Sequence, residues 1–590
     1  MKNFFISFLG TLAGIWFSII LFGVFSLLLM VVAVVSGGAS SSSVSVSKHS
    51  VLYIDLNCNI TESKQPRNIM AELQGEVVPT EPLNRLVAVI GKAADDDRIE
   101  GIFIDCNGAS AGMAQRQAIF NALKEFKKSA PEKWVYAYGD AYTQGDYFTV
   151  CAADSLFINP EGLVDIHGLS ATNLYFKGLL DKLGVNMQVV KVGTYKSAVE
   201  PFIMNGPSEA SVEQQTLFLG NIWSHVRNII AAERKIPADS VNVWADNLMI
   251  AEDVDYYLKS RVVDAKLYRH EFLDRLKALT GQDNLRLVSP SEYAQTVNLG
   301  NGKDKHAKIG IYYASGDIVD SGNEGISAEK MVPEILEIAE DDDVDALVIR
   351  VNSGGGSAFA SEQIWEAIGQ YKAMTGKPVY VSMSDYAASG GYYISCGADR
   401  IYAEPLTLTG SIGIFGLIPD AGGLITDKLG VTAYTVSTNP SGELPSVFKP
   451  MTPLQQTRMQ ARVSRGYELF VRRVAEGRKM SVDSVKAIAE GRVWDGAEAY
   501  KRGLVDELGG LDRVLGDLAK TLNVEDYTVV EYPKVTDRWW EVLLEAGASG
   551  IEARILRNTL GDAAPLYDAM RTLGELSPVQ ARMEYVTVSM

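Results

Sequence analysis

The sequence predicts an α/β protein made of two copies of one unit, each a parallel β-sheet with helices on both faces. Apolar, β-rich runs such as 346–351 end in Gly- and Ser-rich turns. Each turn leads into a segment with the apolar spacing of an amphipathic helix. This order of strand, turn and helix is typical of parallel sheets. The whole pattern occurs twice within the 590 residues.

The composition is that of a folded protein in contact with water. Hydrophobic residues make up 47% of the chain and charged residues 22%. The formal net charge is −18, and no dense Lys/Arg run is present, so nucleic-acid binding is not expected. The four cysteines show neither a CxxC motif nor metal-ligand spacing, which predicts small core side chains rather than disulfides or a metal site.

The N-terminus, residues 1–36, is predicted to be a transmembrane anchor. No charged residue occurs from Asn3 to Ser47, and the apolar run is long enough to cross a hydrocarbon core of ~30 Å. A cleaved signal peptide is the alternative, but its apolar region normally spans only ~7–15 residues. Lys2 precedes the span, which favours a cytoplasmic N-terminus and a body on the other side. The Ser-rich residues 37–50 are expected to form a flexible tether.

An internal repeat organises the rest of the chain. The segment that starts at Ala94 aligns without a gap with the segment that starts at Ala339, and the offset of 245 residues then continues through the next strand and helix. We therefore expect an N-terminal repeat at 51–305, a C-terminal repeat at 306–525 and a helical tail at 526–590.

The two copies differ most at two reactive residue types. Ser389 lies in a strand-to-helix turn of the second copy, and its counterpart in the first copy is Gln144. Lys196 lies in the first copy, and Gly442 takes its place in the second. One half thus holds a serine without the lysine, and the other half a lysine without the serine. A duplicated enzyme that assembles a single site from both halves would have this pattern.

Each residue also has an ordinary structural interpretation. A serine before Gly-Gly at a helix start is often an N-cap, and a lysine in a polar loop is usually solvated. A Ser–His–Asp mechanism would need a histidine near Ser389, but the second copy contains none beyond its first strand. If Ser389 is a nucleophile, a lysine base is therefore the simpler interpretation. The pKa of the lysine, ordinarily ~10.4, then has to be lowered by burial or by a nearby positive charge.

Four motifs carry a family resemblance: YAASGGYYISCGADRIYA, RVNSGGGSAFASE, LTGSIGIFG and VGTYKSAVEPF. They resemble the motifs of the signal peptide peptidase family (SppA, protease IV) in its long double-domain form, and the resemblance covers essentially the whole chain. It implies a tandem duplication of a crotonase/Clp-like (ββα spiral) domain. It also implies a membrane-anchored serine endopeptidase that degrades cleaved signal peptides and other hydrophobic peptides through an acyl-enzyme.

The resemblance assigns roles to five residues. By the family pattern these are Ser389 as nucleophile, Lys196 as general base, Ser411 as the hydroxyl that binds the lysine, and Gly356 and Gly390 as the oxyanion-hole glycines. The expected distance from Ser389 Oγ to Lys196 Nζ is about 2.6–3.2 Å.

The family pattern also implies a setting for the enzyme. We expect a single-pass protein of the inner (cytoplasmic) membrane with its catalytic body on the periplasmic side, a homotetramer, and no metal or organic cofactor. One departure is Gly354, where the family usually has proline. Two other classes stay open as alternatives: a catalytically inactive membrane scaffold, and an acyl-CoA-processing crotonase-type enzyme, which would use similar Gly-rich amides.

Overall fold

The computed structural model describes residues 10–11, 14–23, 25–26, 45–65, 78–299, 307–439, 441–443, 446–534, 579–583 and 588–589. The chain divides into two compact units, residues 1–47 and residues 48–590. In the first unit, residues 14–23 are helical. Among the described residues, no helix is both long and apolar enough to cross a membrane. Most other residues of the predicted anchor lie outside the described part of the chain.

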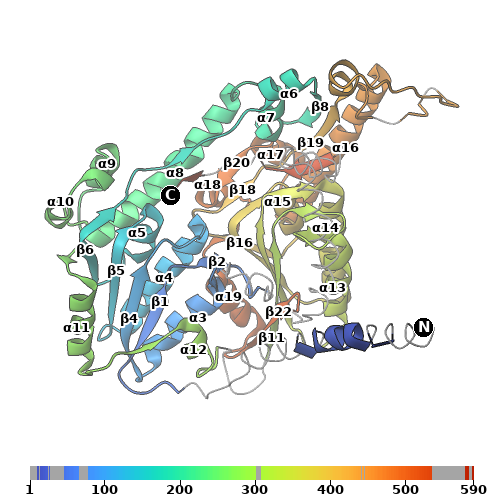
Figure 1. The fold of residues 1–590 in the computed structure, drawn as a ribbon. Helices are drawn as coiled ribbons and strands as arrows, with labels where there is room; N and C mark the ends of the chain where they lie inside the picture. Colours follow the sequence, from blue (N-terminus) through green and yellow to red (C-terminus); the bar gives the residue numbers. More distant parts are fainter. Residues whose placement is uncertain are drawn as a thin grey trace, which may run out of the picture. The chain divides into compact units, whose positions relative to one another are not determined.

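The first repeat is built on a parallel sheet (Figure 1). Its strands, in spatial order, are β10 (Arg286–Val288), β1 (Ser50–Asp55), β4 (Ile99–Cys106), β5 (Trp134–Tyr142), β6 (Ser155–Val164) and β9 (Ala265–Lys266). All the pairings in this sheet are parallel. On one face, Phe272 and Leu276 of α11 (Arg269–Thr280) pack against Phe103 and Tyr138, so this face is shielded from water.

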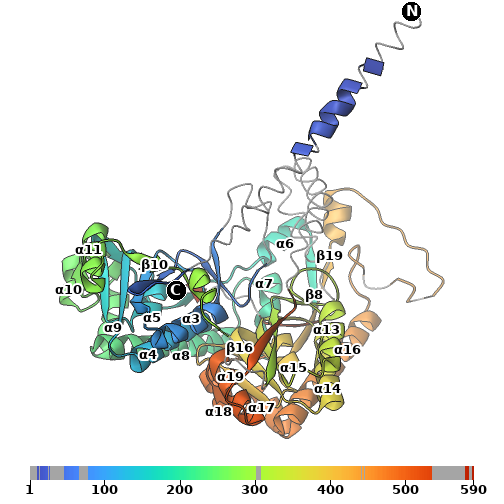
Figure 2. The ribbon, with the colours of Figure 1, turned by 90° about the horizontal axis from the view of Figure 1, so that it is seen from below.

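The first repeat contains the following helices, given in chain order. They are α3 (Leu83–Asp95), α4 (Met113–Ser129), α5 (Gln144–Val150), α6 (Lys177–Leu183), α7 (Glu200–Ile203), α8 (Glu209–Arg234), α9 (Ala238–Asp246), α10 (Val254–Lys259), α11 (Arg269–Thr280) and α12 (Pro290–Ala294), with short 3-10 turns at Ser197–Val199 and Met249–Ala251. Both ribbon views show α3 beside α4 (Figures 1 and 2). A small strand pair, β2 (Asn59–Thr61) with β3 (Thr80–Pro82), precedes α3.

The second repeat has a sheet of the same kind. Its main path is β20 (Val493–Asp495), β18 (Leu408–Gly410), β16 (Val379–Ala388), β14 (Ala346–Ser353), β11 (Lys308–Ser315) and β22 (Thr528–Tyr532), with β17 (Arg400–Ala403) and β21 (Glu507–Leu508) beside it. The pairings are parallel except for the edge strand β20. The predicted parallel α/β architecture is therefore confirmed in both repeats.

Helices cover both faces of the second sheet. They are α13 (Ala328–Glu340), α14 (Ala358–Thr375), α15 (Gly390–Ser395), α16 (Pro453–Arg478), α17 (Val482–Ile488), α18 (Gly496–Lys501) and α19 (Leu511–Leu522), with a π-helical turn at Leu424–Lys428. One face packs on a large core that includes Ile335 and Ile364, and the other packs on Val514 and Leu518 of α19. Burial on both faces explains why β14 is almost continuously apolar.

A third, mixed sheet joins segments that are far apart in the sequence. Its order is β13 (Ile326–Ser327), β12 (Ile318–Val319), β15 (Gly355–Ser357), β23 (Val579–Arg582), β19 (Ile414–Asp420) and β8 (Asn186–Val192). The antiparallel pairing of β8 with β19 links the first repeat to the second. A short pair, β7 (Ser170–Ala171) with β24 (Val588–Ser589), brings the C-terminal residues to the first repeat.

The tail expected to be helical at 526–590 contains no helix in its described residues, and it forms strands at Thr528–Tyr532, Val579–Arg582 and Val588–Ser589. β22 extends the second sheet beside β11, and β23 lies inside the third sheet. The physical reason is burial: Tyr532 and Ala581 belong to the core of the second repeat, and strand pairing satisfies their backbone groups there. The helical prediction is therefore wrong for 528–532 and 579–582, and residues 535–578 lie outside the described part.

Candidate active site

Three polar side chains meet where the two repeats join. Lys196 Nζ lies 2.8 Å from Ser389 Oγ, 3.0 Å from Ser411 Oγ and 3.0 Å from the Ser411 carbonyl oxygen. The three residues are almost completely buried, with exposed fractions of 1%, 0% and 1% for Lys196, Ser389 and Ser411. The lysine and the serine are 193 positions apart in the sequence, so tertiary structure alone creates this cluster.

Ser389 occupies a strained turn between β16 and α15. Its backbone φ is 55° and its ψ −111°, a conformation that residues with a Cβ rarely adopt. Holding a non-glycine residue there costs of order 1–3 kcal/mol, and such residues cluster at functional sites. The Ser389 N–H donates to Gly410 O at 2.8 Å, which ties the turn to β18. Because its φ/ψ is not that of an ordinary N-cap, Ser389 makes no side-chain cap to α15.

Lys196 reaches the serine because β8 carries the first repeat into the third sheet. The chain leaves β8 through Gly193, and Tyr195 N–H then donates to Glu490 O at 2.9 Å. Gly413 and Gly491 leave room for the lysine stem, since a Cβ on Gly413 would lie 3.2 Å from Lys196 Cδ and one on Gly491 would lie 2.8 Å from Lys196 Cβ. Sequence reasoning did not single out Glu490, Gly413 or Gly491.

The surroundings of Lys196 disfavour its charged form. Burial away from water lowers the pKa of Lys196 well below its ordinary value. Its described hydrogen-bond partners are two hydroxyl groups and one carbonyl oxygen, none of which carries a charge. A neutral amine has two N–H donors and one lone pair. When the donors serve the two Ser411 oxygens, the lone pair faces Ser389 Oγ, which is the arrangement of a general base.

The two predicted oxyanion glycines lie in closely packed backbone beside the serine. A Cβ on Gly356 would lie 2.0 Å from Ile318 O, and one on Gly390 would lie 2.7 Å from Ser361 Oγ, so larger residues do not fit without a shift. Gly390 begins α15, where the first N–H groups have no partner within the helix. Gly354 stands where the family usually has proline. No atom lies within 4 Å of the position that a Cβ on Gly354 would occupy.

The corresponding positions of the first repeat hold a structural contact instead. Gln144 is fully buried, and its Oε1 accepts from the N–H groups of His167 and Gly168 at 2.9 and 2.8 Å. Gly442 lies in an exposed part of the second repeat. His167 pairs with Asp165 at 2.9 Å. Within the described residues, the pair formed by Lys196 of the first repeat and Ser389 of the second therefore has no equivalent at Gln144.

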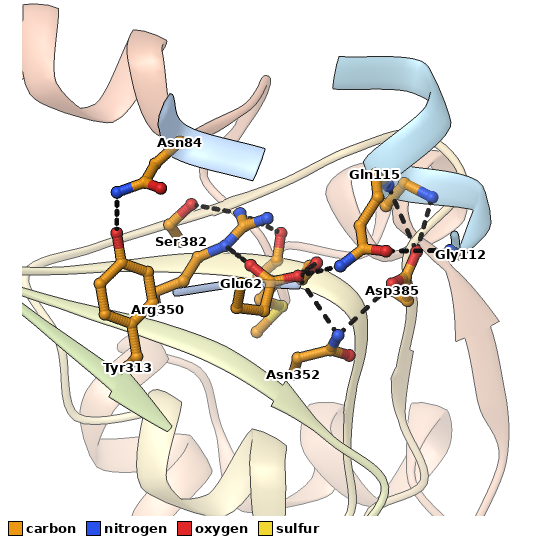
Figure 3. A network of polar contacts seen from close by, with 12 residues as sticks. Glu62, Asn84, Gly112, Gln115, Tyr313, Arg350, Asn352, Ser382 and Asp385 are labelled. Carbon is orange, nitrogen blue, oxygen red and sulfur yellow. Dashed lines mark hydrogen bonds and ion pairs between the residues drawn. The ribbon is translucent and has the colours of Figure 1, made fainter. Parts of the chain in front are cut away.

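A buried polar network ties the first repeat to β16, the strand that ends directly before Ser389 (Figure 3). Glu62 accepts from Arg350 Nε and Gln115 Nε2, both at 2.7 Å, and from Ser384 Oγ. Arg350 also donates to Ser382 Oγ at 2.9 Å. Ser382 and Ser384 belong to β16, the strand that ends at Ala388. A segment near the start of the chain thus holds β16 in place. Sequence reasoning missed this network, because its members show no motif.

Asp385 of the second repeat caps a helix of the first. Its Oδ1 accepts from the N–H groups of Ala114 and Gln115 at 2.8 and 3.3 Å, at the start of α4 (Figure 3). A Cβ on Gly112 would lie 2.1 Å from the Asp385 carboxyl carbon, so a glycine is needed for this approach. Burial, with the charge of Glu62 nearby, raises the pKa of Asp385 to about 6.

The described residues contain no candidate metal site and no cysteine that is set up for thiol chemistry. Over the described part of the chain, no three His, Cys, Asp or Glu side chains cluster as a metal site would require. The four cysteines are free and buried, as expected of core residues. Burial raises the pKa of Cys106 well above its ordinary value, and that of Cys58 to about 11. A raised thiol pKa means that little reactive thiolate forms at neutral pH.

Comparison with known proteins identifies the family. The model of peptidase family S49 matches residues 127–276 and 372–525, one stretch in each repeat. "Protease 4" of Haemophilus influenzae is 33% identical over 582 residues, which cover 95% of this chain and 94% of the relative. "Protease 4" of Salmonella typhi is 37% identical over 473 residues, 77% of this chain and 74% of the relative. "Serine protease SPPA, chloroplastic" of Arabidopsis thaliana is 30% identical over 482 residues, 78% and 69% of the two chains.

These matches confirm the resemblance seen in the four motifs. They extend over both repeats, and the similarity to the Haemophilus influenzae relative spans nearly the whole length of each chain. The chain therefore belongs to peptidase family S49, a family of serine peptidases.

Proposed function

We propose that this chain is an endopeptidase with a Ser389/Lys196 dyad. The observation that carries the proposal is the 2.8 Å approach of Lys196 Nζ to Ser389 Oγ in a buried setting that favours the neutral amine. Membership of a serine peptidase family supports the same reaction class. The first repeat supplies the base and the second supplies the nucleophile, consistent with the proposed division into repeats at 51–305 and 306–525, each with a crotonase/Clp-like fold.

Acylation then proceeds in two steps. Ser389 Oγ forms a bond to the peptide carbonyl carbon while its proton passes to Lys196 Nζ, and the carbonyl oxygen becomes an oxyanion that accepts from the N–H groups of Gly356 and Gly390. The oxyanion then collapses, the C–N bond breaks, and the leaving amine takes the proton from the Lys196 ammonium. Ser411 holds the lysine through both steps. The product is an ester on Ser389.

Deacylation repeats the chemistry with water. Neutral Lys196 takes a proton from a water molecule, whose oxygen attacks the ester carbonyl, and the same two N–H groups hold the second oxyanion. The C–O bond to Ser389 then breaks, and Oγ recovers its proton from Lys196. The carboxylic acid product leaves, and neither step requires a metal or an organic cofactor.

A serine-reactive fluorophosphonate probe tests the reaction class. The wild-type chain should be labelled at Ser389, and the peptide that carries the label is identified by mass spectrometry. Ser389→Ala should abolish labelling, and Lys196→Ala should reduce its rate by at least ~100-fold because the nucleophile loses its base. A matched control, Ser395→Ala, should label at the wild-type rate. Absence of labelling in a folded wild-type chain would refute the proposal.

The proposed substrates are cleaved signal peptides and other hydrophobic peptides. We propose that residues 1–36 anchor the chain in the inner membrane, with the body on the periplasmic side, on the basis of the uncharged stretch from Asn3 to Ser47. Protease added to spheroplasts should digest the body together with a periplasmic control protein. Protection of the body under those conditions would rule out this topology.

We also propose a closed, head-to-tail homotetramer, which the internal repeat supports. In the first repeat, β8 follows the DKLGV motif and pairs with β19 of the next repeat. The corresponding segment of the second repeat, residues 432–438, belongs to no strand of the described part, and Tyr434 and Val436 are 90% and 85% exposed. In Figure 1 it lies in the extended orange loop near α16. By the same geometry, it would pair with the first repeat of a second copy.

A further inference from the structure

A segment from the C-terminus of the same chain lies beside Gly356 and Gly390, the two glycines next to the paired serine and lysine. A peptide substrate has to reach Ser389 Oγ, yet Ser389 is 0% exposed. The segment Val579–Met583 contains β23, which lies between β15 and β19 in the third sheet. β15 contains Gly355 and Gly356 of the Gly-rich turn, and β19 starts three residues after Ser411.

This segment pairs with both neighbours as an extended peptide would. Against β15, Ala581 lies opposite Gly356 and Arg582 opposite Gly355, in antiparallel register. Against β19, Gln580 lies opposite Phe415 and Val579 opposite Gly416, also antiparallel. β23 therefore fills the space between β15 and β19 and pairs through its main chain with both strands. This is the manner in which a peptide adds as a β-strand to two sheet edges.

The carbonyl group of Ala581 lies close to both proposed oxyanion glycines. Met583 N–H donates to Gly354 O at 2.8 Å. Hydrogen-bonded pairs alternate along an antiparallel ladder, so the next such pair is Gly356 with Ala581, and the Gly356 N–H is directed at Ala581 O. Ala581 O also lies only 3.0 Å from the point where a Cβ on Gly390 would stand. The oxygen is therefore close to both glycines whose amides are proposed to hold the oxyanion.

Side-chain contacts hold the segment in this register. The methyl group of Ala581 is fully buried, with an exposed fraction of 0%. Arg582 forms an ion pair with Asp317. Met583 is 6% exposed and lines a small cavity with Ser197 and Phe218, close to the start of the lysine segment. The position next to the carbonyl thus accepts a small residue, and the following side chains have specific partners.

We propose that residues 579–583 are an intramolecular ligand of the peptide-binding groove and inhibit the enzyme by occupying it. The groove binds an extended peptide between β15 and β19, with a small residue at the position of Ala581 and its carbonyl facing Ser389. A substrate enters only when the segment has left. This inference rests on the proposed function for the identity of the site, but occupancy of the groove is a binding property that is measurable without catalysis.

Binding is tested in full-length chains that cannot react. The variant Ser389→Ala/Ala581→Trp should have an open groove, because an indole does not fit where the Ala581 methyl group is fully buried. A fluorescent synthetic peptide with the sequence of residues 577–586 should bind this variant saturably. It should bind Ser389→Ala alone at least tenfold more weakly, since the groove is then occupied. The same peptide with tryptophan in place of its alanine should not bind to either chain.

Activity is tested in chains that retain Ser389. Ala581→Trp should raise kcat/KM for a quenched hydrophobic peptide at least tenfold over wild type. Val588→Trp, the same kind of change in β24, should leave kcat/KM unchanged. Peptide binding that is equal in the two Ser389→Ala chains, or absent from both, would overturn the proposal even if the fluorophosphonate probe labels Ser389. Groove-specific binding with no labelling would instead retain this inference and refute the proposed peptidase.

Discussion

At the scale of single residues, the proposed chemistry depends on the burial of Lys196 away from water. Burial lowers the pKa of Lys196, and its described partners are uncharged oxygens; both favour the neutral amine, which is the form that accepts a proton. The strained backbone of Ser389 keeps its hydroxyl against that amine instead of in a helix cap. Neither property is visible in the residue types alone, because lysines and serines are common in solvated loops and caps.

Removing either member of the dyad should abolish peptidase activity without unfolding the chain. Ser389→Ala, Lys196→Ala and Lys196→Arg should each lose at least ~1,000-fold in kcat/KM, since a guanidinium does not release a proton near neutral pH. The double variant Ser389→Ala/Lys196→Ala should be scarcely worse than either single variant, because the two residues act as one unit. Circular dichroism checks folding. Near-normal acylation by Lys196→Ala at neutral pH would exclude the mechanism.

The pH dependence of the rate should report the lysine. A base works only when unprotonated, so kcat/KM should rise with pH through the pKa of Lys196 and then level off. Because burial lowers that pKa, the plateau should be reached well below ~10.4, the ordinary value for lysine. Single-turnover acylation rates between pH 5 and pH 10 measure the profile. A rate that continues to rise to the top of this range would contradict a lowered lysine pKa.

The oxyanion glycines should differ from their first-repeat counterparts. Gly356→Pro removes a proposed N–H donor and should reduce turnover by at least ~100-fold. Ala111→Pro is the matched change in the first repeat, where Gln144 takes the place of the proposed nucleophile, and it should affect stability more than chemistry. Acylation rates per folded molecule separate the two effects. Equal losses in both variants would contradict the assignment of Gly356.

At the scale of elements, one repeat positions the reactive strand of the other. β16 ends directly before Ser389, and its residues Ser384 and Asp385 contact Glu62 and the start of α4 in the first repeat. Buried polar networks of this kind are costly when one member is removed, because the remaining groups lose their partners. The first repeat therefore stabilises the geometry of the site in addition to supplying the lysine.

Asp385 should make the stability of the chain depend on pH. Its pKa is raised from 3.8 to about 6, so the folded chain binds the proton more tightly than the unfolded chain. The resulting stabilisation is fully present below about pH 4 and is lost as the pH rises through about 6, with a total of about 3 kcal/mol. Asp385→Asn, which cannot ionise, should therefore gain free energy of unfolding relative to wild type between pH 4 and pH 7.

Urea unfolding of both chains at pH 4.5 and pH 7.5 measures this difference. Asp140→Asn is the matched control, because Asp140 is the counterpart of Asp385 in the first repeat and is exposed. It should follow the wild-type pH profile. Parallel profiles for Asp385→Asn and wild type would show that the carboxyl group does not titrate in the expected range.

At the scale of the whole molecule, the duplication predicts how copies assemble. Within one chain, β8 of the first repeat pairs with β19 of the second, and the counterpart of β8 at 432–438 has no strand partner in the described part of the chain. A heterologous contact of this kind closes into a ring when the rotation between copies allows it. The segment is apolar where it is most exposed, which favours a protein partner over water.

Charges in the exposed segment should prevent assembly. Tyr434→Asp/Val436→Asp should convert the proposed tetramer to a monomer, because two carboxylates would be buried without partners in the new strand pair. Mass photometry of the full chain in detergent measures the oligomer. Val243→Asp, on the exposed face of α9, is the control and should leave the assembly intact. A double variant that still forms the wild-type oligomer would exclude this contact.

The sequence alone determined the parallel α/β units, their tandem repeat and the split of a serine and a lysine between the copies. These features follow from patterns within the sequence. Apolar periodicity indicates which faces are buried, and the constant offset of 245 residues between similar segments indicates the duplication. The sequence also favoured a lysine base, because the second copy has no histidine beyond its first strand.

Tertiary structure alone decided which distant groups meet. It paired β8 with β19 and so brought Lys196 to Ser389, it placed Asp385 on the start of α4, and it inserted Val579–Arg582 between β15 and β19. The tail was expected to be helical, but Thr528–Tyr532 and Val579–Arg582 are strands because the open edges of other strands supply their backbone partners. Such pairings depend on surfaces formed by residues hundreds of positions apart, and local periodicity carries no information about them.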